Sequence, residues 1–148
     1  MLFLRVDYLL HLQSQARSTA DTFYKLMSKK SILIVDDKEQ IAKILYAYLH
    51  GDYACMYKQN PVEALAWMHK GNVPDLIISD IRMPEMRGDE FLHLLKHNEL
   101  FRDIPVVMLS SEDSTSERIR LLEEGAEDYI VKPFNPMELK IRIKKILD

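Results

Sequence analysis

Hydrophobic and polar positions alternate in a regular way from Ser31 to the end of the chain. Five short runs consist mainly of apolar residues, which is typical of strands that are buried on both faces of a sheet. These runs are Ile32–Val35, Ala54–Tyr57, Asp75–Ser79, Val106–Leu109 and Tyr129–Val131. A segment with apolar residues at helical spacing follows each run. The pattern therefore predicts five strand-helix units.

Capping residues mark where several of these helices begin. Asn60-Pro61 and Asn135-Pro136 have the order expected for an N-cap followed by the first helical position. Ser114 and Glu117 have the spacing of a capping box, in which each side chain bonds to the other residue's backbone N–H group. In the helix that Gly88 opens, the spacing predicts that four residues face inward, namely Phe91, Leu92, Leu94 and Leu95.

Strands that alternate with helices predict an α/β fold, with a doubly wound parallel sheet, helices on both faces and right-handed crossovers. The order of the strands does not follow from the pattern. The strand ends carry the polar chemistry. They deliver Asp36 and Asp37, then Asp80, Ser110 and Lys132. The carboxyl ends of parallel strands share one edge of the sheet, where α/β proteins bind their ligands.

Three carboxylates at one edge repel one another, by about 4 kcal/mol per pair at about 4 Å and an effective dielectric constant of about 20. Oxygen ligands of high charge suit Mg2+, and Lys132 supplies a second cation. A carboxylate beside a metal ion and an ammonium group suits nucleophilic attack on phosphorus. The hydroxyl group of Ser110 can donate to a phosphoryl oxygen. We therefore expect an aspartyl phosphate at Asp80.

Composition narrows the class of protein further. The chain has 148 residues, of which 47% are hydrophobic and 29% charged, a balance typical of one soluble globular domain. Its formal net charge of -3 gives no electrostatic reason to expect direct binding of nucleic acid. No apolar run approaches the roughly 18 residues that span a bilayer, so no membrane contact is expected. The single cysteine, Cys55, excludes an internal disulfide and is expected to be a small buried residue. We expect a cytoplasmic protein.

Residues 1–30 form an extension ahead of the first strand, and the domain proper is expected to cover residues 31–148. The extension contains neither glycine nor proline, and residues 2–27 are expected to be helical. Its weak heptad seam consists of Leu2, Val6, Leu9, Gln13, Ala16, Ala20, Phe23 and Met27. Such a helix would pack on the domain or pair with a second copy in a homodimer. Alternatively, the chain starts at Met27 and the residues before it are an upstream extension without function.

Four groups of residues together resemble a known family, the receiver domains of two-component response regulators, of which the CheY-like proteins are typical. The groups are Asp36-Asp37, Ser79-Asp80-Ile81-Arg82-Met83-Pro84 with Gly88, Ser110, and the segment from Gly125 to Phe134. The resemblance covers about residues 31–148. It implies a five-stranded flavodoxin-like sheet of order 2-1-3-4-5.

The resemblance also implies a role for each residue of the acidic group. Asp80 matches the phosphoacceptor. Asp37 and Asp80 match the direct ligands of Mg2+, while Asp36 acts largely through water. Arg82 matches the residue whose backbone carbonyl completes the metal shell.

Three further residues match the family's switch and its lysine. Ser110 and Tyr129 match the switch pair, in which phosphate draws the hydroxyl group of Ser110 toward it and Tyr129 rotates into the vacated space. Lys132 matches the essential lysine, which is joined to Pro133 by what is usually a cis peptide bond.

The function implied is a single-domain response regulator in a phosphorelay. It would take phosphate from a sensor histidine kinase or a histidine phosphotransfer protein and present a changed surface, built from the fourth and fifth strand-helix units, to a downstream protein. We do not expect an enzyme beyond self-catalysed phosphoryl acceptance and slow autodephosphorylation. Two alternatives are a phosphatase of the haloacid dehalogenase type and an unphosphorylated scaffold receiver. Lys38 argues against the phosphatase, which needs a second aspartate two residues after its nucleophile.

One more expectation concerns the lifetime of the phosphoryl group. Arg82 and Glu112 follow Asp80 and Ser110 by the same interval, so their side chains are expected to meet across the mouth of the site. A partly screened ion pair there would restrict the approach of an attacking water molecule.

Overall fold

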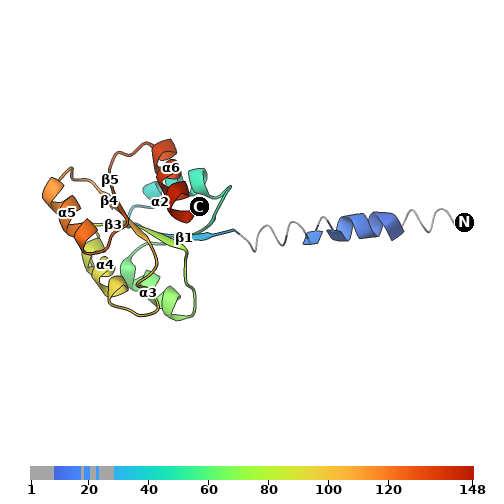
Figure 1. Cartoon of the computed structure of the whole chain (residues 1–148), viewed down its shortest axis with the longest axis horizontal. Helices are drawn as coiled ribbons and strands as arrows, with labels where there is room; N and C mark the ends of the chain where they lie inside the picture. Colours follow the sequence, from blue (N-terminus) through green and yellow to red (C-terminus); the bar gives the residue numbers. More distant parts are fainter. Residues whose placement is uncertain (1–8, 18, 21–22, 24–28) are drawn as a thin grey trace, which may run out of the picture.

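The computed structural model describes residues 9–17, 19–20, 23 and 29–148. Between Ser31 and Leu147, strands and helices alternate along the chain (Figure 1). The strands are β1 (Ser31–Val35), β2 (Ala54–Lys58), β3 (Leu76–Asp80), β4 (Val106–Ser110) and β5 (Asp128–Val131). The helices are α2 (Glu39–Leu49), α3 (Pro61–His69), α4 (Gly88–Lys96), α5 (Thr115–Glu123) and α6 (Pro136–Leu147). The predicted α/β fold is confirmed.

All five strands form one parallel sheet in the order β2-β1-β3-β4-β5, which is the order that the resemblance implies. The register aligns the ends of the central strands. Val35 pairs with Ser79, Asp80 pairs with Leu109, and Ser110 pairs with Val131. Residues that follow these positions are therefore delivered at similar levels along one edge.

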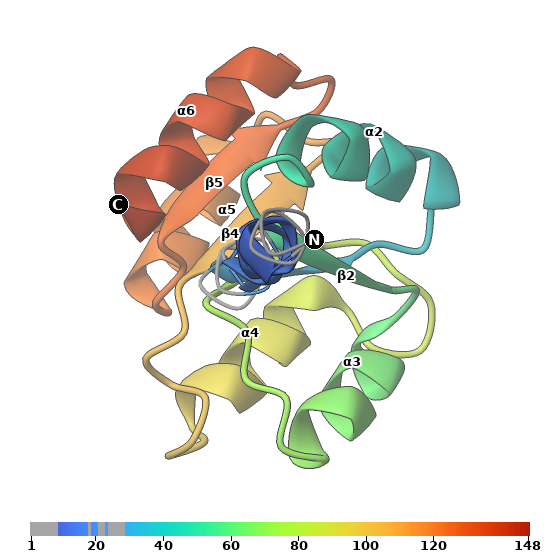
Figure 2. The same ribbon diagram turned by 90° about the vertical axis from the view of Figure 1, so that its right-hand side faces the viewer.

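The two faces of the sheet are covered by different helices. Successive residues of a strand point to opposite faces. In β1, Leu33 and Val35 belong to the cluster that includes residues of α3, α4 and α5, whereas Ile32 and Ile34 belong to the cluster with α2 and α6. Figure 2 shows α2 and α6 on one side of the sheet and α3 and α4 on the other. Both faces are thus buried, which explains the continuous apolar runs.

Two details differ from the sequence predictions. Leu94 is 44% exposed, so α4 buries Phe91, Leu92 and Leu95 but not this fourth residue. Cys55 is only partly buried, because β2 is an edge strand with one free side. Asp80 is the last residue of β3, at the carboxyl end of the strand as predicted.

The N-terminal extension is described only in part. Residues 9–17, 19–20 and 23 are helical, and the other positions of the predicted helix lie outside the described residues. The described ones are all exposed, including Leu9, Leu12 and Phe23, so none of them is packed into the core. Pairing with a second copy stays a prediction. In the part of the chain that the structure describes, no helix is both long and apolar enough to cross a membrane.

Candidate functional site

Three aspartates meet at the carboxyl edge of the sheet. Asp36 follows β1 and Asp80 ends β3, and these strands are neighbours. Each of Asp36, Asp37 and Asp80 offers a carboxylate oxygen, and these oxygens lie within 4.8 Å of one another. Asp36 and Asp80 are buried, whereas Asp37 is exposed. The predicted acidic cluster is therefore present, and it opens to solvent on the side of Asp37.

Lys132 brings an ammonium group into this cluster from the end of β5. Its Nζ atom lies 3.2 Å from Oδ2 of Asp36 and 3.1 Å from Oδ1 of Asp80. The lysine side chain is only 12% exposed. Its backbone N–H donates to the carbonyl oxygen of Ser110, which ties the ends of β5 and β4 together. The peptide bond from Lys132 to Pro133 is cis, as predicted.

The charges of the cluster are only partly balanced. Burial raises the pKa of the Asp36 carboxyl group above its ordinary value, although the N–H of Lys38 and the ammonium of Lys132 both favour the charged form. The N–H of Lys38 donates to Oδ1 of Asp36 at 2.8 Å. One ammonium group faces three carboxylates, so the cluster favours a further cation. Its donors are all oxygen atoms, the ligand type that Mg2+ prefers.

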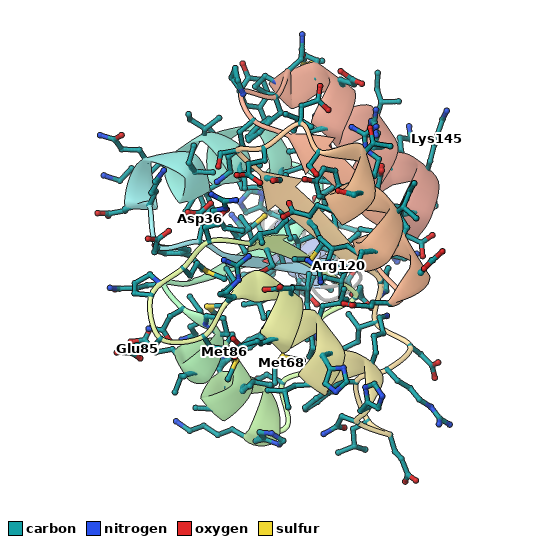
Figure 3. All side chains as sticks on the ribbon, turned by 90° about the vertical axis from the view of Figure 1, so that its left-hand side faces the viewer. Asp36, Met68, Glu85, Met86, Arg120 and Lys145 are labelled. Atoms are coloured by element: carbon teal, nitrogen blue, oxygen red, sulfur yellow. The ribbon has the colours of Figure 1, made fainter. Side chains whose placement is uncertain are left out.

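The chain after Asp80 is held in a tight loop. The N–H of Ile81 donates to Oδ1 of Asp80 at 2.9 Å, and the N–H of Gly88 donates to the carbonyl oxygen of Ile81 at 2.7 Å. A Cβ atom added at Gly88 would lie 2.0 Å from the carbonyl oxygen of Asp80, so only glycine allows α4 to begin this close. In Figure 3, Glu85 and Met86 of this loop lie on the same side of the molecule as Asp36, and Lys145 lies on the opposite side.

Ser110 and Tyr129 are both buried beside this edge. The Ser110 hydroxyl donates to Oε1 of Glu117 at 3.0 Å and accepts from the N–H of Glu112 at 3.0 Å. The Tyr129 hydroxyl lies 2.7 Å from the same Oε1 and 2.8 Å from the carbonyl oxygen of Glu112. Burial is the main cause that raises the pKa of Tyr129. Tyr129 is 4% exposed, so its ring is buried while the Ser110 hydroxyl is still bonded to Glu117.

Glu117 is the residue of this network that sequence reasoning missed. The capping box assigned its side chain to the start of α5, but only half of that motif forms. The hydroxyl of Ser114 accepts from the N–H of Glu117, as expected. The carboxylate of Glu117 instead binds the two hydroxyl groups of Ser110 and Tyr129. The sequence did carry a signal for this role. Glu117 is a carboxylate in the first turn of a helix that starts shortly after Ser110.

Arg82 and Glu112 meet as predicted. A guanidinium nitrogen of Arg82 contacts Oε1 of Glu112, and the side chains are 51% and 44% exposed. The pair joins the loop after β3 to the loop after β4. The role of the Arg82 carbonyl as a metal ligand stays a prediction.

Comparison with known proteins agrees with this geometry. The chain is 40% identical over 122 residues to the phosphate regulon transcriptional regulatory protein PhoB of Pseudomonas aeruginosa, an alignment that covers 82% of this chain and 53% of the relative. It thus spans about half the length of that relative.

Solved structures of response regulators are also similar to this chain. The chemotaxis response regulator CheY4 of Vibrio cholerae superimposes with a TM-score of 0.75 at 31% identity, covering 81% of this chain and all of that one. A structure described as a putative response regulator from Chloroflexus aurantiacus gives 0.76 at 35% identity, covering 81% and 98% of the two chains. A sequence profile of the response regulator receiver domain matches residues 32–144. The chain therefore belongs to the family of response regulator receiver domains.

Proposed function

We propose that Asp80 accepts a phosphoryl group from a histidine kinase or a histidine phosphotransfer protein in a Mg2+-dependent reaction. The observation that carries this proposal is the position of Asp80, whose Oδ1 lies 3.1 Å from the ammonium of Lys132 among three clustered carboxylates. Receiver domains generally bind Mg2+ at such an acidic pocket and interact with histidine kinases and downstream targets.

The reaction follows from the positions of these groups. A carboxylate oxygen of Asp80 forms a bond to phosphorus while the bond between phosphorus and the donor's imidazole nitrogen breaks, and the imidazole keeps the electron pair. Lys132 balances charge on the transferred group, and Ser110 donates a hydrogen bond to it. Bound Mg2+ would supply further charge neutralisation. Asp37, Asp80 and the carbonyl of Arg82 would hold it directly, and Asp36 through water.

The proposed output is a change in the surface formed by α5, β5 and α6. Ser110 ends β4 and Tyr129 lies in β5, so a shift of the Ser110 hydroxyl toward the phosphate disturbs the packing at the start of α5. A downstream protein, or a second copy of this chain, would read that change. Regulation without a further output module stays a prediction, because the PhoB relative is nearly twice as long as the aligned segment.

Intact-mass measurement after incubation with acetyl phosphate and Mg2+ tests the proposal. We expect the wild-type chain to gain the mass of one phosphoryl group, and Asp80→Asn to gain none. Omission of Mg2+ should suppress the gain.

A chain that gains no mass under any condition would support the unphosphorylated scaffold. Sustained release of phosphate that survives Asp80→Asn would support a phosphatase. We propose that neither of these two results occurs, and that the protein catalyses only its own phosphorylation and slow dephosphorylation.

A further inference from the structure

The carboxylate of Glu117 connects the two switch residues. Its Oε1 atom receives the hydroxyl of Ser110 at 3.0 Å and lies 2.7 Å from the hydroxyl of Tyr129. Ser110 is 2% exposed and Tyr129 is 4% exposed, whereas Glu117 is half-buried, so both contacts are partly shielded from water. Hydrogen bonds to an ionised acceptor in such a site are stronger than those between neutral groups.

The proton of the Ser110 hydroxyl is committed to Glu117. A serine hydroxyl has one proton to donate, and here the backbone N–H of Glu112 already points at its oxygen. To donate to a phosphoryl group on Asp80, Ser110 must therefore give up its bond to Glu117. The carboxylate of Glu117 and the phosphoryl oxygens are two anionic acceptors that compete for one proton.

Tyr129 keeps Glu117 in place during this exchange. The phenol also has a single proton, and the carboxylate is a stronger acceptor than the carbonyl oxygen of Glu112, the other group within reach. The guanidinium of Arg118, the next residue of α5, lies 5.5 Å from the centre of the Tyr129 ring. These contacts fix the ring and the first turn of α5 around the carboxylate.

Capping does not require this carboxylate. The start of α5 is capped by the Ser114 hydroxyl, which accepts from the backbone N–H of Glu117. That bond needs the backbone of residue 117 and not its side chain. Loss of the carboxylate therefore leaves the cap intact.

We propose that Glu117 is a positioning residue that holds the Ser110 hydroxyl away from Asp80 and so opposes the phosphorylated conformation. The inference rests on the proposed function, because it assumes that a phosphoryl group forms at Asp80. Removal of the carboxylate frees the Ser110 proton, and the chain then binds a phosphoryl group or its mimic more tightly. The restraint acts only through the Ser110 hydroxyl.

Titration with beryllofluoride, a phosphoryl mimic that bonds to carboxylates, tests the inference in the presence of saturating Mg2+. Backbone amide NMR shifts near the site report the dissociation constant. We expect Glu117→Ala to lower that constant by about tenfold, as loss of one hydrogen bond to a charged acceptor predicts. Glu117→Gln keeps the shape and a weaker acceptor, and it should lower the constant by about threefold. Glu123→Ala, an exposed change on the same helix, should leave it unchanged.

A second pair of variants separates this restraint from a merely structural role. In a chain that carries Ser110→Ala, no hydroxyl proton remains to be released, so adding Glu117→Ala should change the dissociation constant by less than about twofold. An equal effect of Glu117→Ala with and without the Ser110 hydroxyl would overturn the inference, as would unchanged binding in both Glu117 variants. Wild-type protein that binds no beryllofluoride would instead count against the proposed function.

Discussion

Asp75 and Asp80 lie at opposite ends of β3 and differ in burial and in the groups around them. Asp75 precedes the strand and is exposed, and its Oδ2 accepts from the backbone N–H of Ser31 at 2.7 Å and from the Ser31 hydroxyl at 3.3 Å. Asp80 ends the strand and is 5% exposed, beside two more carboxylates and the ammonium of Lys132. Asp75 thus bonds to the first residue of the neighbouring strand, and Asp80 lies among charged groups.

The direction of the strand explains the difference. At the amino edge of the sheet, the backbone N–H of Ser31, the first residue of β1, is satisfied by the carboxylate of Asp75. At the carboxyl edge, the following loops carry further side chains, and those of β1, β3 and β5 converge on one place. Of the two aspartates, Asp75 therefore serves structure at one edge, and Asp80 lies in the acidic cluster at the other edge, where we propose that it accepts phosphate.

Lys132→Ala should give the largest effect at the reactive edge. It removes the only ammonium group that the described residues place within 4 Å of Asp80. Loss of one such charge partner in an anionic transition state costs about a hundredfold or more in rate. The rate of mass gain with acetyl phosphate measures this. Lys140→Ala, which breaks the surface pair with Asp52, is the matched control and should leave the rate unchanged. Equal rates in all three proteins would reject a role for Lys132 in phosphoryl acceptance.

Arg82→Ala should have a smaller effect, on the lifetime of the phosphoryl group. The pair with Glu112 is about half exposed, and such pairs contribute at most about 1 kcal/mol, so we expect phosphoryl loss to be about two- to fivefold faster. The decay of the phosphorylated mass after removal of acetyl phosphate measures the rate. Arg87→Ala breaks another ion pair formed by an exposed arginine, the pair with Asp89, and should leave the decay unaltered. If Arg82→Ala decays at the wild-type rate, the pair does not restrict water.

Asp75→Ala should have the smallest effect and no effect on the chemistry. The N–H of Ser31 loses its acceptor at a solvent-exposed edge, which costs about 1 kcal/mol of the free energy of unfolding. Urea denaturation measures this cost. Phosphorylation by acetyl phosphate should proceed at the wild-type rate. A loss of phosphorylation in the folded variant would show that the two edges are not independent.

The sequence predicted the reactive edge because strand ends are strongly marked. Buried apolar runs locate each strand, and the parallel direction then places Asp36, Asp80, Ser110 and Lys132 together. Their assignment to a receiver domain needed the resemblance to known proteins. The pair of Arg82 and Glu112 was predictable for the same reason, because both follow adjacent strands by equal intervals.

Other features depend on tertiary packing, which the order of apolar and polar residues along the chain does not determine. Cys55 is half-buried because β2 lies at the sheet's edge, and strand order is absent from the periodicity. Leu94 fits the helical spacing of α4, but the nine-residue helix buries too narrow a stripe to include it. Glu117 has the spacing of a capping box, yet its carboxylate bonds to the buried hydroxyl groups of Ser110 and Tyr129 instead of the backbone N–H of Ser114.

Identification of the modified residue tests the central claim most directly. Protein treated with acetyl phosphate and Mg2+ is reduced with borohydride, which converts an aspartyl phosphate to homoserine, and the peptides are then sequenced by mass spectrometry. We predict homoserine at position 80 and aspartate at positions 36 and 37. Homoserine at another position, or an unaltered Asp80 in protein that has gained a phosphoryl group, would contradict it.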